Sequence, residues 1–159
     1  MNQTIRKVKL EDISALKEVL DSSELFPSEM LDDMIADYFN KADSEDIWFT
    51  TIQERKPISI GYCAPERMTE GTYNLYAIAV RKELQGQGVG AGMMRYIEDQ
   101  LRESGHRVLL VETSGLPEYA LTRKFYDQCN YQREAVVRDF YQEGEDKVIF
   151  WKKLISKIQ

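Results

Sequence analysis

The sequence has no long apolar segment, and this shortage excludes the simplest membrane-spanning designs. No apolar run approaches the roughly 20 residues that cross a bilayer as a helix. The first residues, MNQTIRKVKLEDI, also lack the apolar core of a secretory signal. We therefore expect a cytoplasmic protein that acts away from membranes.

Cysteine and histidine are scarce, which limits the metal-binding and catalytic schemes that the chain can support. Cys63 and Cys129 stand far apart without companion histidines, a pattern that matches no zinc site and no disulfide framework. We expect both to be small buried hydrophobic residues, and we expect no metal. His106 is the only histidine, so a scheme that needs two is excluded. Its position between Gly105 and Arg107 predicts a loop and makes it a weak candidate base.

The sequence also lacks a basic excess. Its 21 Lys and Arg residues against 27 Asp and Glu give a formal net charge of -6. A nucleic-acid-binding protein needs a basic face, so we expect no nucleic-acid partner. The acidic balance suits a cationic small molecule such as an amine. With 159 residues, 43% hydrophobic and 30% charged, the chain is predicted to form a single domain over residues 1–159.

Hydrophobic periodicity predicts helices and strands throughout the chain. The predicted strands are 4–8, 48–53, 58–64, 73–80, 107–113, 132–141 and 147–154. The predicted helices are 11–22, 28–40, 90–104 and about 117–129. The order β-α-α-β-β-β-α-β-α-β-β predicts an α+β fold, with a mixed, mostly antiparallel central sheet and helices on both of its faces.

A glycine-rich turn between the strand 73–80 and the helix 90–104 is the most informative segment. Gly86, Gly88 and Gly90 let the backbone approach a ligand closely, and the free N–H groups of the following helix favour an anion such as phosphate. A Walker P-loop would end in Gly-Lys-Ser/Thr, which is absent. The Rossmann spacing G-x-G-x-x-G is also absent, since the glycines here read G-x-G-x-G. A turn whose glycines serve only packing is the structural alternative.

The segment Gln85-Gly86-Gln87-Gly88-Val89-Gly90 resembles the acyl-CoA pyrophosphate loop of the GNAT superfamily, Q/R-x-x-G-x-G/A. Residues 75–80 look like the core strand of that family. The resemblance covers nearly the whole chain in element order and is specific from about residue 75 to 131. It implies that acetyl-CoA is the acyl donor, and a homodimer is typical of proteins with this resemblance, although the sequence leaves the oligomeric state open. By resemblance, the backbone of Ile78, Ala79 and Val80 would pair with the pantetheine arm. The pyrophosphate would be held by Gln85, Gly86, Gln87, Gly88, Val89, Gly90 and Ala91.

Tyr126 is the candidate general acid. Residues 122–131 resemble the family pattern A-x-x-L-Y-x-x-x-G-F, in which the tyrosine hydroxyl faces the CoA sulfur. A phenol, with a usual pKa of about 10, is protonated at neutral pH and can donate. Thr122 and Asn130 depart from the pattern, and Tyr119 stands where an asparagine is common. Helical spacing predicts that a stripe of Leu121, Phe125 and Cys129 faces the core with Tyr126 at its edge. A boundary tyrosine without a catalytic role is the alternative.

Glu112 is the candidate general base, near the end of the strand 107–113. A matching glutamate acts as base in the family members that acetylate protein N-termini, although the spacing to Tyr126 is two residues longer here. A water relay from another carboxylate remains an alternative, as does a purely structural role. Either Tyr73 or Tyr76 is expected to line the acceptor cavity. The sequence therefore predicts an N-acetyltransferase acting on a small-molecule amine, with protein N-termini, lysines or a non-catalytic acyl-CoA sensor as alternatives.

Overall fold

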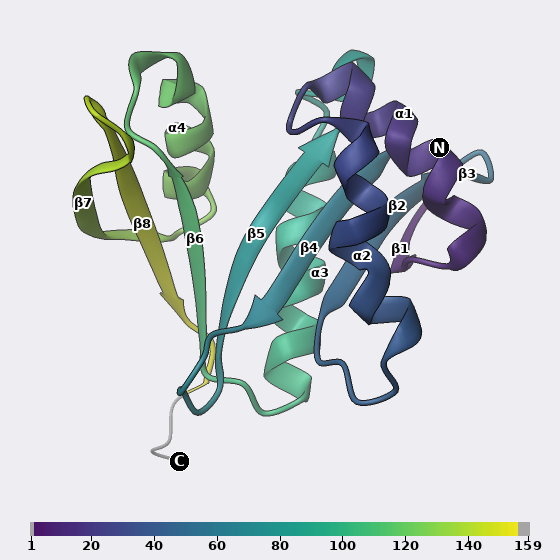
Figure 1. Ribbon diagram of the computed structural model, residues 1–159, viewed down its shortest axis with the longest axis horizontal. Coiled ribbons are helices and arrows are strands. Elements are labelled where there is room, and N and C mark those ends of the chain that lie inside the picture. The colour runs from purple at the N-terminus through teal and green to yellow at the C-terminus, as the bar shows by residue number, and fades with distance from the viewer. Residues whose placement is uncertain (1, 156–159) are drawn as a thin grey trace. The chain divides into compact units, whose positions relative to one another are not determined.

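The computed structural model describes residues 2–155 (Figure 1). The strands are β1 (Gln3–Lys7), β2 (Ile47–Gln53), β3 (Lys56–Pro57), β4 (Ser59–Pro65), β5 (Thr72–Val80), β6 (Val108–Ser114), β7 (Gln132–Gln142) and β8 (Glu145–Lys153). The helices are α1 (Ile13–Ser23), α2 (Leu31–Asn40), α3 (Val89–Glu103) and α4 (Ala120–Gln128). The strands are ordered β1-β2-β4-β5-β6-β8-β7, with β3 paired to β2.

This architecture confirms the predicted class, a mixed and mostly antiparallel sheet flanked by helices. The β5–β6 pair is parallel, while β1–β2, β2–β4, β6–β8 and β7–β8 are antiparallel. Every predicted helix and strand is present. The segment predicted as a turn at 54–57 contains the short strand β3. Three predicted helices begin as 3-10 turns, at Leu10–Asp12, Ser28–Met30 and Pro117–Tyr119, because a tighter first turn is a common way to enter an α-helix.

The chain divides into two compact units. The first comprises residues 2–64 and 76–97, and the second comprises residues 65–75 and 98–155. No helix within residues 2–155 combines the length and the apolar character that crossing a membrane requires.

In the first unit, helices cover both faces of the strands (Figure 1). On one face, α1 and α2 bury their apolar stripes against β2 and β4. This cluster contains Leu16, Val19, Leu20, Leu31, Ile35, Trp48 and Ile60. The next residue of β2, Phe49, points to the opposite face because side chains alternate along a strand, and there it contacts Tyr96 of α3. Gly61 leaves room for the Phe49 ring, since a Cβ at this position would collide with it.

In the second unit, α4 packs on the antiparallel strands β6, β8 and β7. The Tyr126 ring lies 5.3 Å from that of Phe150 in β8 and 6.3 Å from that of Tyr131. A buried polar cluster joins the end of α3 to β8: the Tyr131 hydroxyl donates to Glu98 Oε2 at 2.6 Å, and Lys152 Nζ donates to the same oxygen at 3.0 Å. Every polar group in this cluster therefore has a partner, as burial requires.

The predicted inner face of α4 is wrong. Leu121 is 82% exposed and Phe125 and Cys129 are half-buried, whereas Tyr126 is only 4% exposed. The helix is rotated so that Tyr126 packs against the rings of Phe150 and Tyr131.

The predictions for the cysteines and the histidine are confirmed in part. Cys63 is buried as predicted and Cys129 is half-buried, and within residues 2–155 neither cysteine forms a disulfide. His106 lies in the loop between α3 and β6, as predicted, with its ring 4.5 Å from that of Tyr73.

Candidate functional site

The glycine-rich turn lies in the first unit and leads from β5 into α3. Gly86 and Gly88 have φ angles of 77° and 87°, a left-handed conformation that glycine adopts without a steric penalty. A Cβ on either glycine would meet no other described residue within 4 Å, apart from the chain neighbours. Close packing therefore does not explain why glycine stands at these two positions. The left-handed backbone conformation of the turn explains it.

The turn ends in a helix terminus whose N–H groups are available to an anion. The Gly92 N–H donates to the Gly88 carbonyl at 3.1 Å, which is the first turn of α3. The N–H groups of Val89, Gly90 and Ala91 precede this bond, so no helical carbonyl can accept from them. Residues 85–88 are exposed. Together with the positive end of the helix dipole, these N–H groups form an open site suited to a phosphate group.

The start of the turn is fixed by contacts within the first unit. Gln85 Nε2 donates to the Val80 carbonyl at 3.0 Å, so this side chain braces the turn against the end of β5. The Lys82 N–H donates to the Ser22 hydroxyl of α1 at 2.8 Å. Arg81 pairs with Glu83 at 2.7 Å. The segment before the glycines is therefore anchored, and α3 begins directly after Gly88.

The three strand residues predicted to contact pantetheine lie just before this turn. Ile78 and Ala79 are half-buried and Val80 is buried. The parallel ladder pairs Thr72–Leu75 of β5 with Val108–Val111 of β6, and residues 78–80 lie beyond the registered part of β5.

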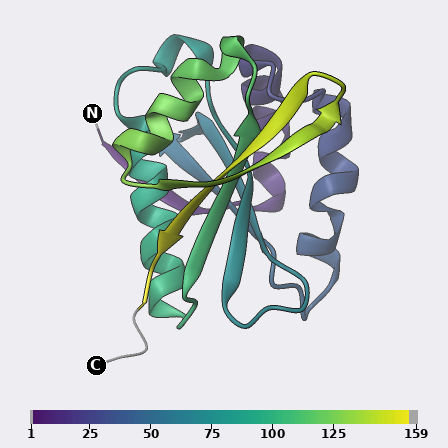
Figure 2. The ribbon, with the colours of Figure 1, turned by 90° about the vertical axis from the view of Figure 1, so that its left-hand side faces the viewer.

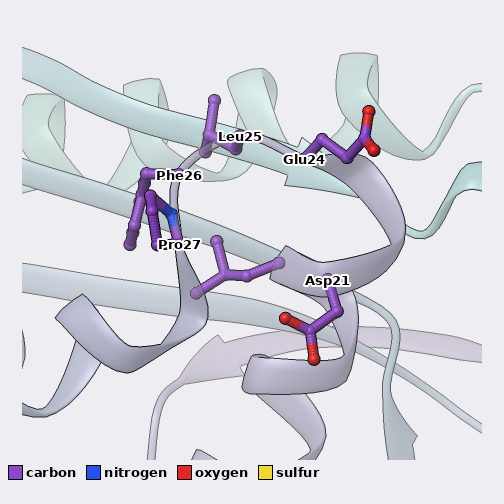
Figure 3. A pocket seen from close by; sticks show the side chains of 6 residues that line it. Asp21, Glu24, Leu25, Phe26 and Pro27 are labelled. Atoms are coloured by element: carbon purple, nitrogen blue, oxygen red, sulfur yellow. The ribbon is translucent and has the colours of Figure 1, made fainter.

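An open hollow lies at the connection between α1 and α2 (Figure 3). It combines apolar and acidic side chains from Leu20, Asp21, Glu24, Leu25, Phe26 and Pro27. Asp21, which lines the hollow, directly precedes Ser22, and the Ser22 hydroxyl accepts the hydrogen bond from the Lys82 N–H. The sequence did not identify this hollow, because its lining residues form no motif.

Glu112, in the second unit, is held by two neighbours that sequence reasoning missed. Asn74 Nδ2 donates to Glu112 Oε2 at 2.7 Å, and Lys147 Nζ lies 3.1 Å from Glu112 Oε1. The same amide nitrogen donates to Glu66 Oε2 at 3.1 Å. Lys147 Nζ also lies 3.7 Å from the centre of the Phe140 ring. The Glu112 carboxylate is thus fixed in position, and each of its oxygens keeps a lone pair that can accept a proton.

Beside Glu112, the amide oxygen of Asn74 accepts no hydrogen bond from any described residue. The Asn74 side chain is fully buried, and its Oδ1 atom has no hydrogen-bond partner within residues 2–155. Asn74 and Lys147 come from β5 and β8, on either side of Glu112 in β6. Only the strand order brings these segments together, which explains why no local motif could have identified them.

Tyr126 is enclosed by aromatic rings on the inner face of α4. Burial raises the pKa of its phenol well above the usual range. The hydroxyl therefore stays protonated at every physiological pH and can act as a hydrogen-bond or proton donor. This is the chemical state that the proposed acid needs, although the residue is far more buried than the sequence predicted.

The two strand tyrosines differ in exposure. Tyr73 is buried against His106, whereas Tyr76 is 49% exposed and its ring centre lies 5.6 Å from that of Tyr62. Tyr76 is thus the better candidate for a substrate contact.

At the end of α4, Asn130 adopts a φ of 70°, so it takes the left-handed conformation at the position where the family pattern has glycine. Within residues 2–155, no three histidine, cysteine or carboxylate side chains gather as a metal site would require.

Comparisons with known proteins agree with this geometry. The sequence pattern of the acetyltransferase (GNAT) family matches residues 13–131. An uncharacterized N-acetyltransferase from Methanocaldococcus jannaschii is 28% identical over 89 residues, which are 54% of this chain and 54% of that protein. The match thus spans about half the length of that relative.

Solved structures resemble the chain over its full length. A protein from Desulfovibrio desulfuricans, described as a GNAT-family acetyltransferase, has a TM-score of 0.90 and 28% identity, with 97% of this chain and 100% of that chain covered. A protein from Salmonella typhimurium, solved with its cofactor acetyl-CoA, has a TM-score of 0.81 at 15% identity, with 100% of this chain and 98% of that chain covered.

Proposed function

This chain belongs to the acetyltransferase (GNAT) family, and from that premise we propose that it transfers an acetyl group from acetyl-CoA to the primary amine of a small molecule. The observation that carries the proposal is the exposed glycine turn at the N-terminus of α3, where positive φ angles at Gly86 and Gly88 leave the N–H groups of Val89 to Ala91 open to a phosphate.

The residues around this turn fit the chemical parts of acetyl-CoA. The backbone of residues 85–91 would hold the pyrophosphate, which needs several N–H donors and no side-chain base. The backbone of Ile78, Ala79 and Val80 would pair with the amides of the pantetheine arm, as one strand pairs with another. Acetyl-CoA supplies an activated thioester, so the protein needs no covalent intermediate of its own.

Glu112 and Tyr126 supply the two proton transfers of a direct attack. The neutral amine forms a bond to the thioester carbonyl carbon, and Glu112 accepts the proton that this nitrogen loses. The carbon–sulfur bond then breaks, and Tyr126 donates a hydrogen bond or its proton to the departing thiolate. Asn74 and Lys147 hold the Glu112 carboxylate in one orientation.

A small, cationic acceptor is supported by charge and by the hollow at the end of α1. The formal net charge of -6 attracts cations, and the hollow offers Asp21 and Glu24 beside apolar side chains. Tyr76, exposed on β5, adds a ring on which an ammonium group can pack.

The substrate class is tested by incubating the protein and acetyl-CoA with small amines in one series and with peptides in a second. Mass spectrometry of the products is expected to show acetylated small amines. The double variant Asp21→Asn, Glu24→Gln is expected to raise KM for a cationic amine without raising KM for acetyl-CoA. Acetylated peptides with untouched small amines would favour a protein acetyltransferase instead, and cofactor binding without any product would favour an acyl-CoA sensor.

A further inference from the structure

The hairpin of β7 and β8 contains a large bulge (Figure 2). β7 pairs with β8 at Val137–Lys147 and next at Gln142–Glu145, so four residues of β7 stand opposite one residue of β8. Extra residues on one strand bend it and redirect its side chains, and such bulges are common beside active sites. The side chains of residues 138–141 therefore need not alternate between the two faces of the hairpin.

Asp139 fixes the conformation of the bulge. Its φ of 55° lies in the left-handed region, which is uncommon for residues other than glycine. The Asp139 N–H donates to Asp146 Oδ1 at 3.0 Å, and the Gly144 N–H donates to Asp139 Oδ1 at 2.9 Å. The Gly115 N–H donates to the Asp146 carbonyl at 2.9 Å, which joins the bulge to the residue that follows β6. Hydrogen bonds on both sides of Asp139 thus hold this backbone in place.

The bulge brings the rings of Phe140 and Tyr141 together. Neighbouring residues of a regular strand point to opposite faces, but these two ring centres lie only 5.0 Å apart, with an angle of 87° between the ring planes. This is the edge-to-face arrangement that aromatic pairs prefer. Phe140 is 50% exposed and Tyr141 is 45% exposed. Two large aromatic side chains therefore stand together at the surface, as they do at binding sites.

The two rings lie beside the Glu112 carboxylate. Lys147 Nζ is 3.1 Å from Glu112 Oε1 and 3.7 Å from the centre of the Phe140 ring. Burial, and next the charge of Glu112, raise the pKa of the Tyr141 phenol, so this ring is also near the carboxylate. Lys147 shows that a nitrogen within hydrogen-bonding distance of Glu112 can contact an aromatic ring of the bulge at the same time.

We propose that Phe140 and Tyr141 select the acceptor by binding an apolar group carried next to its amine. The inference rests on the proposed function, in which Glu112 accepts the proton of the acceptor nitrogen. When that nitrogen is at Glu112, the carbon chain attached to it lies against the two rings and leaves water there. The preferred acceptors are therefore primary amines with a bulky apolar substituent. Asp139 and Asp146 act as positioning residues, since they hold the bulge that presents the rings.

Two amines that differ only in apolar bulk test this selection. Ethylamine and isopentylamine are both cationic primary amines, so the proton transfer to Glu112 is common to them. The kcat/KM of the unchanged protein is expected to be roughly tenfold or more higher for isopentylamine, because its three further carbon atoms pack on the rings. Phe140→Ala and Tyr141→Ala are each expected to lower this ratio about threefold or more, mainly by raising KM for isopentylamine.

Val136→Ala is the matched control, because it removes an exposed apolar side chain of the same strand outside the bulge, and it is expected to keep the ratio. An equal kcat/KM for the two amines in the unchanged protein would overturn the proposal. A preference for isopentylamine that survives both ring variants would overturn it as well.

Binding without turnover separates this proposal from the proposed function. Isothermal titration with isopentylamine in the presence of CoA, which carries no acetyl group to transfer, measures acceptor binding alone. The dissociation constant is expected to rise about threefold or more in Phe140→Ala and to stay unchanged in Val136→Ala. This result would support the binding role even if no amine were acetylated, and only the proposed function would then fail. Undetectable binding, or equal binding by all three proteins, would overturn the proposal.

Asp146 variants test the positioning of the rings. Asp146→Ala removes the acceptor of the Asp139 N–H and is expected to lower the ratio of the two kcat/KM values, as the ring variants do. Asp146→Asn keeps an oxygen that can accept this hydrogen bond and is expected to retain the ratio. A purely structural defect would slow both amines alike. An unchanged ratio in Asp146→Ala would contradict the positioning role.

Discussion

Tyr126 is buried in an aromatic cluster, and its raised pKa keeps its hydroxyl protonated throughout the physiological pH range. Tyr126→Phe keeps the ring contacts with Phe150 and Tyr131, so stability is expected to change little. Loss of the donor is expected to lower kcat about 100-fold at an unchanged KM for acetyl-CoA. Steady-state release of the CoA thiol measures both parameters.

Tyr131→Phe is the matched control for this prediction. It also removes a buried phenol, but that phenol donates to Glu98 at 2.6 Å and has no assigned part in the chemistry. We expect a loss of about 1–2 kcal/mol of stability, because the buried Glu98 loses a donor, and a nearly unchanged kcat. If both variants lost activity equally, a general packing effect would replace the acid assigned to Tyr126.

Asp12 makes the stability of the protein sensitive to acid. Burial raises the pKa of Asp12, but the hydrogen bonds from Arg6 and from the Lys9 N–H outweigh this effect, and the net pKa is lowered. Because its folded-state pKa is lowered, the Asp12 carboxylate stabilises the fold at pH values above its unfolded-state pKa, which is near 4. This stabilisation is lost as the pH falls through the folded-state pKa. Asp12→Asn is therefore expected to cost about 1–2 kcal/mol at neutral pH and to reduce the acid-induced loss of stability.

Urea denaturation at neutral pH and below about pH 4 measures this difference. Asp99→Asn serves as the control, because Asp99 pairs with Arg102 at the surface, and exposed pairs contribute little. An Asp12→Asn variant that loses as much stability in acid as the unchanged protein would show that other carboxylates cause the acid sensitivity.

At the scale of the elements, the glycine turn links backbone conformation to cofactor binding. Gly88→Ala places a Cβ on a residue with a φ of 87°, which costs about 1 kcal/mol or rearranges the turn. Because the neighbouring N–H groups then point differently, we expect the dissociation constant for acetyl-CoA to rise at least tenfold, as isothermal titration calorimetry can measure.

Gly144→Ala is a matched test of the same strain in another turn. Gly144 connects β7 and β8, has a φ of 85°, and also has no described neighbour within 4 Å of an added Cβ. The Gly144→Ala variant is therefore expected to lose a similar amount of stability and to bind acetyl-CoA as strongly as the unchanged protein. Weakened binding in both variants would mean that the loss at Gly88 reflects the fold as a whole.

The elements were largely predictable from the sequence because their signals are local. Apolar residues at helical spacing located α1 to α3, and the turn residues separated the strands. The inner face of α4 was mispredicted because Tyr126 and Phe125 are neighbours on the helix, and the rings of Phe150 and Tyr131 decide which of them is buried. Asn74 and Lys147 could not be placed beside Glu112, since that contact depends on the strand order.

At the scale of the whole molecule, binding of acetyl-CoA is expected to raise the melting temperature. A ligand that binds only the folded state stabilises it by about 2.7 kcal/mol at a concentration 100 times its dissociation constant. Differential scanning calorimetry with increasing acetyl-CoA measures this shift, which is expected to be smaller in Gly88→Ala at the same concentration. An unchanged melting temperature in the parent protein would contradict cofactor binding itself.

Several whole-molecule expectations remain predictions. They are the single domain over residues 1–159, the cytoplasmic location and the absence of a nucleic-acid or membrane partner. The acidic net charge supports the expectation about nucleic acids, since a protein of charge -6 has no general attraction to phosphate backbones. Filter binding to duplex DNA and to single-stranded RNA at low salt would measure it, with no retention as the expected result.

Attack of an amine on acetyl-CoA is tested most directly by measuring CoA thiol release as the amine concentration is varied. The rate is expected to rise with the amine concentration, to saturate, and to yield one acetylated amine for each thiol released. In Tyr126→Phe the rate is expected to be strongly reduced. Thiol release that is absent or independent of the amine, in a protein that still binds acetyl-CoA, would rule out this reaction.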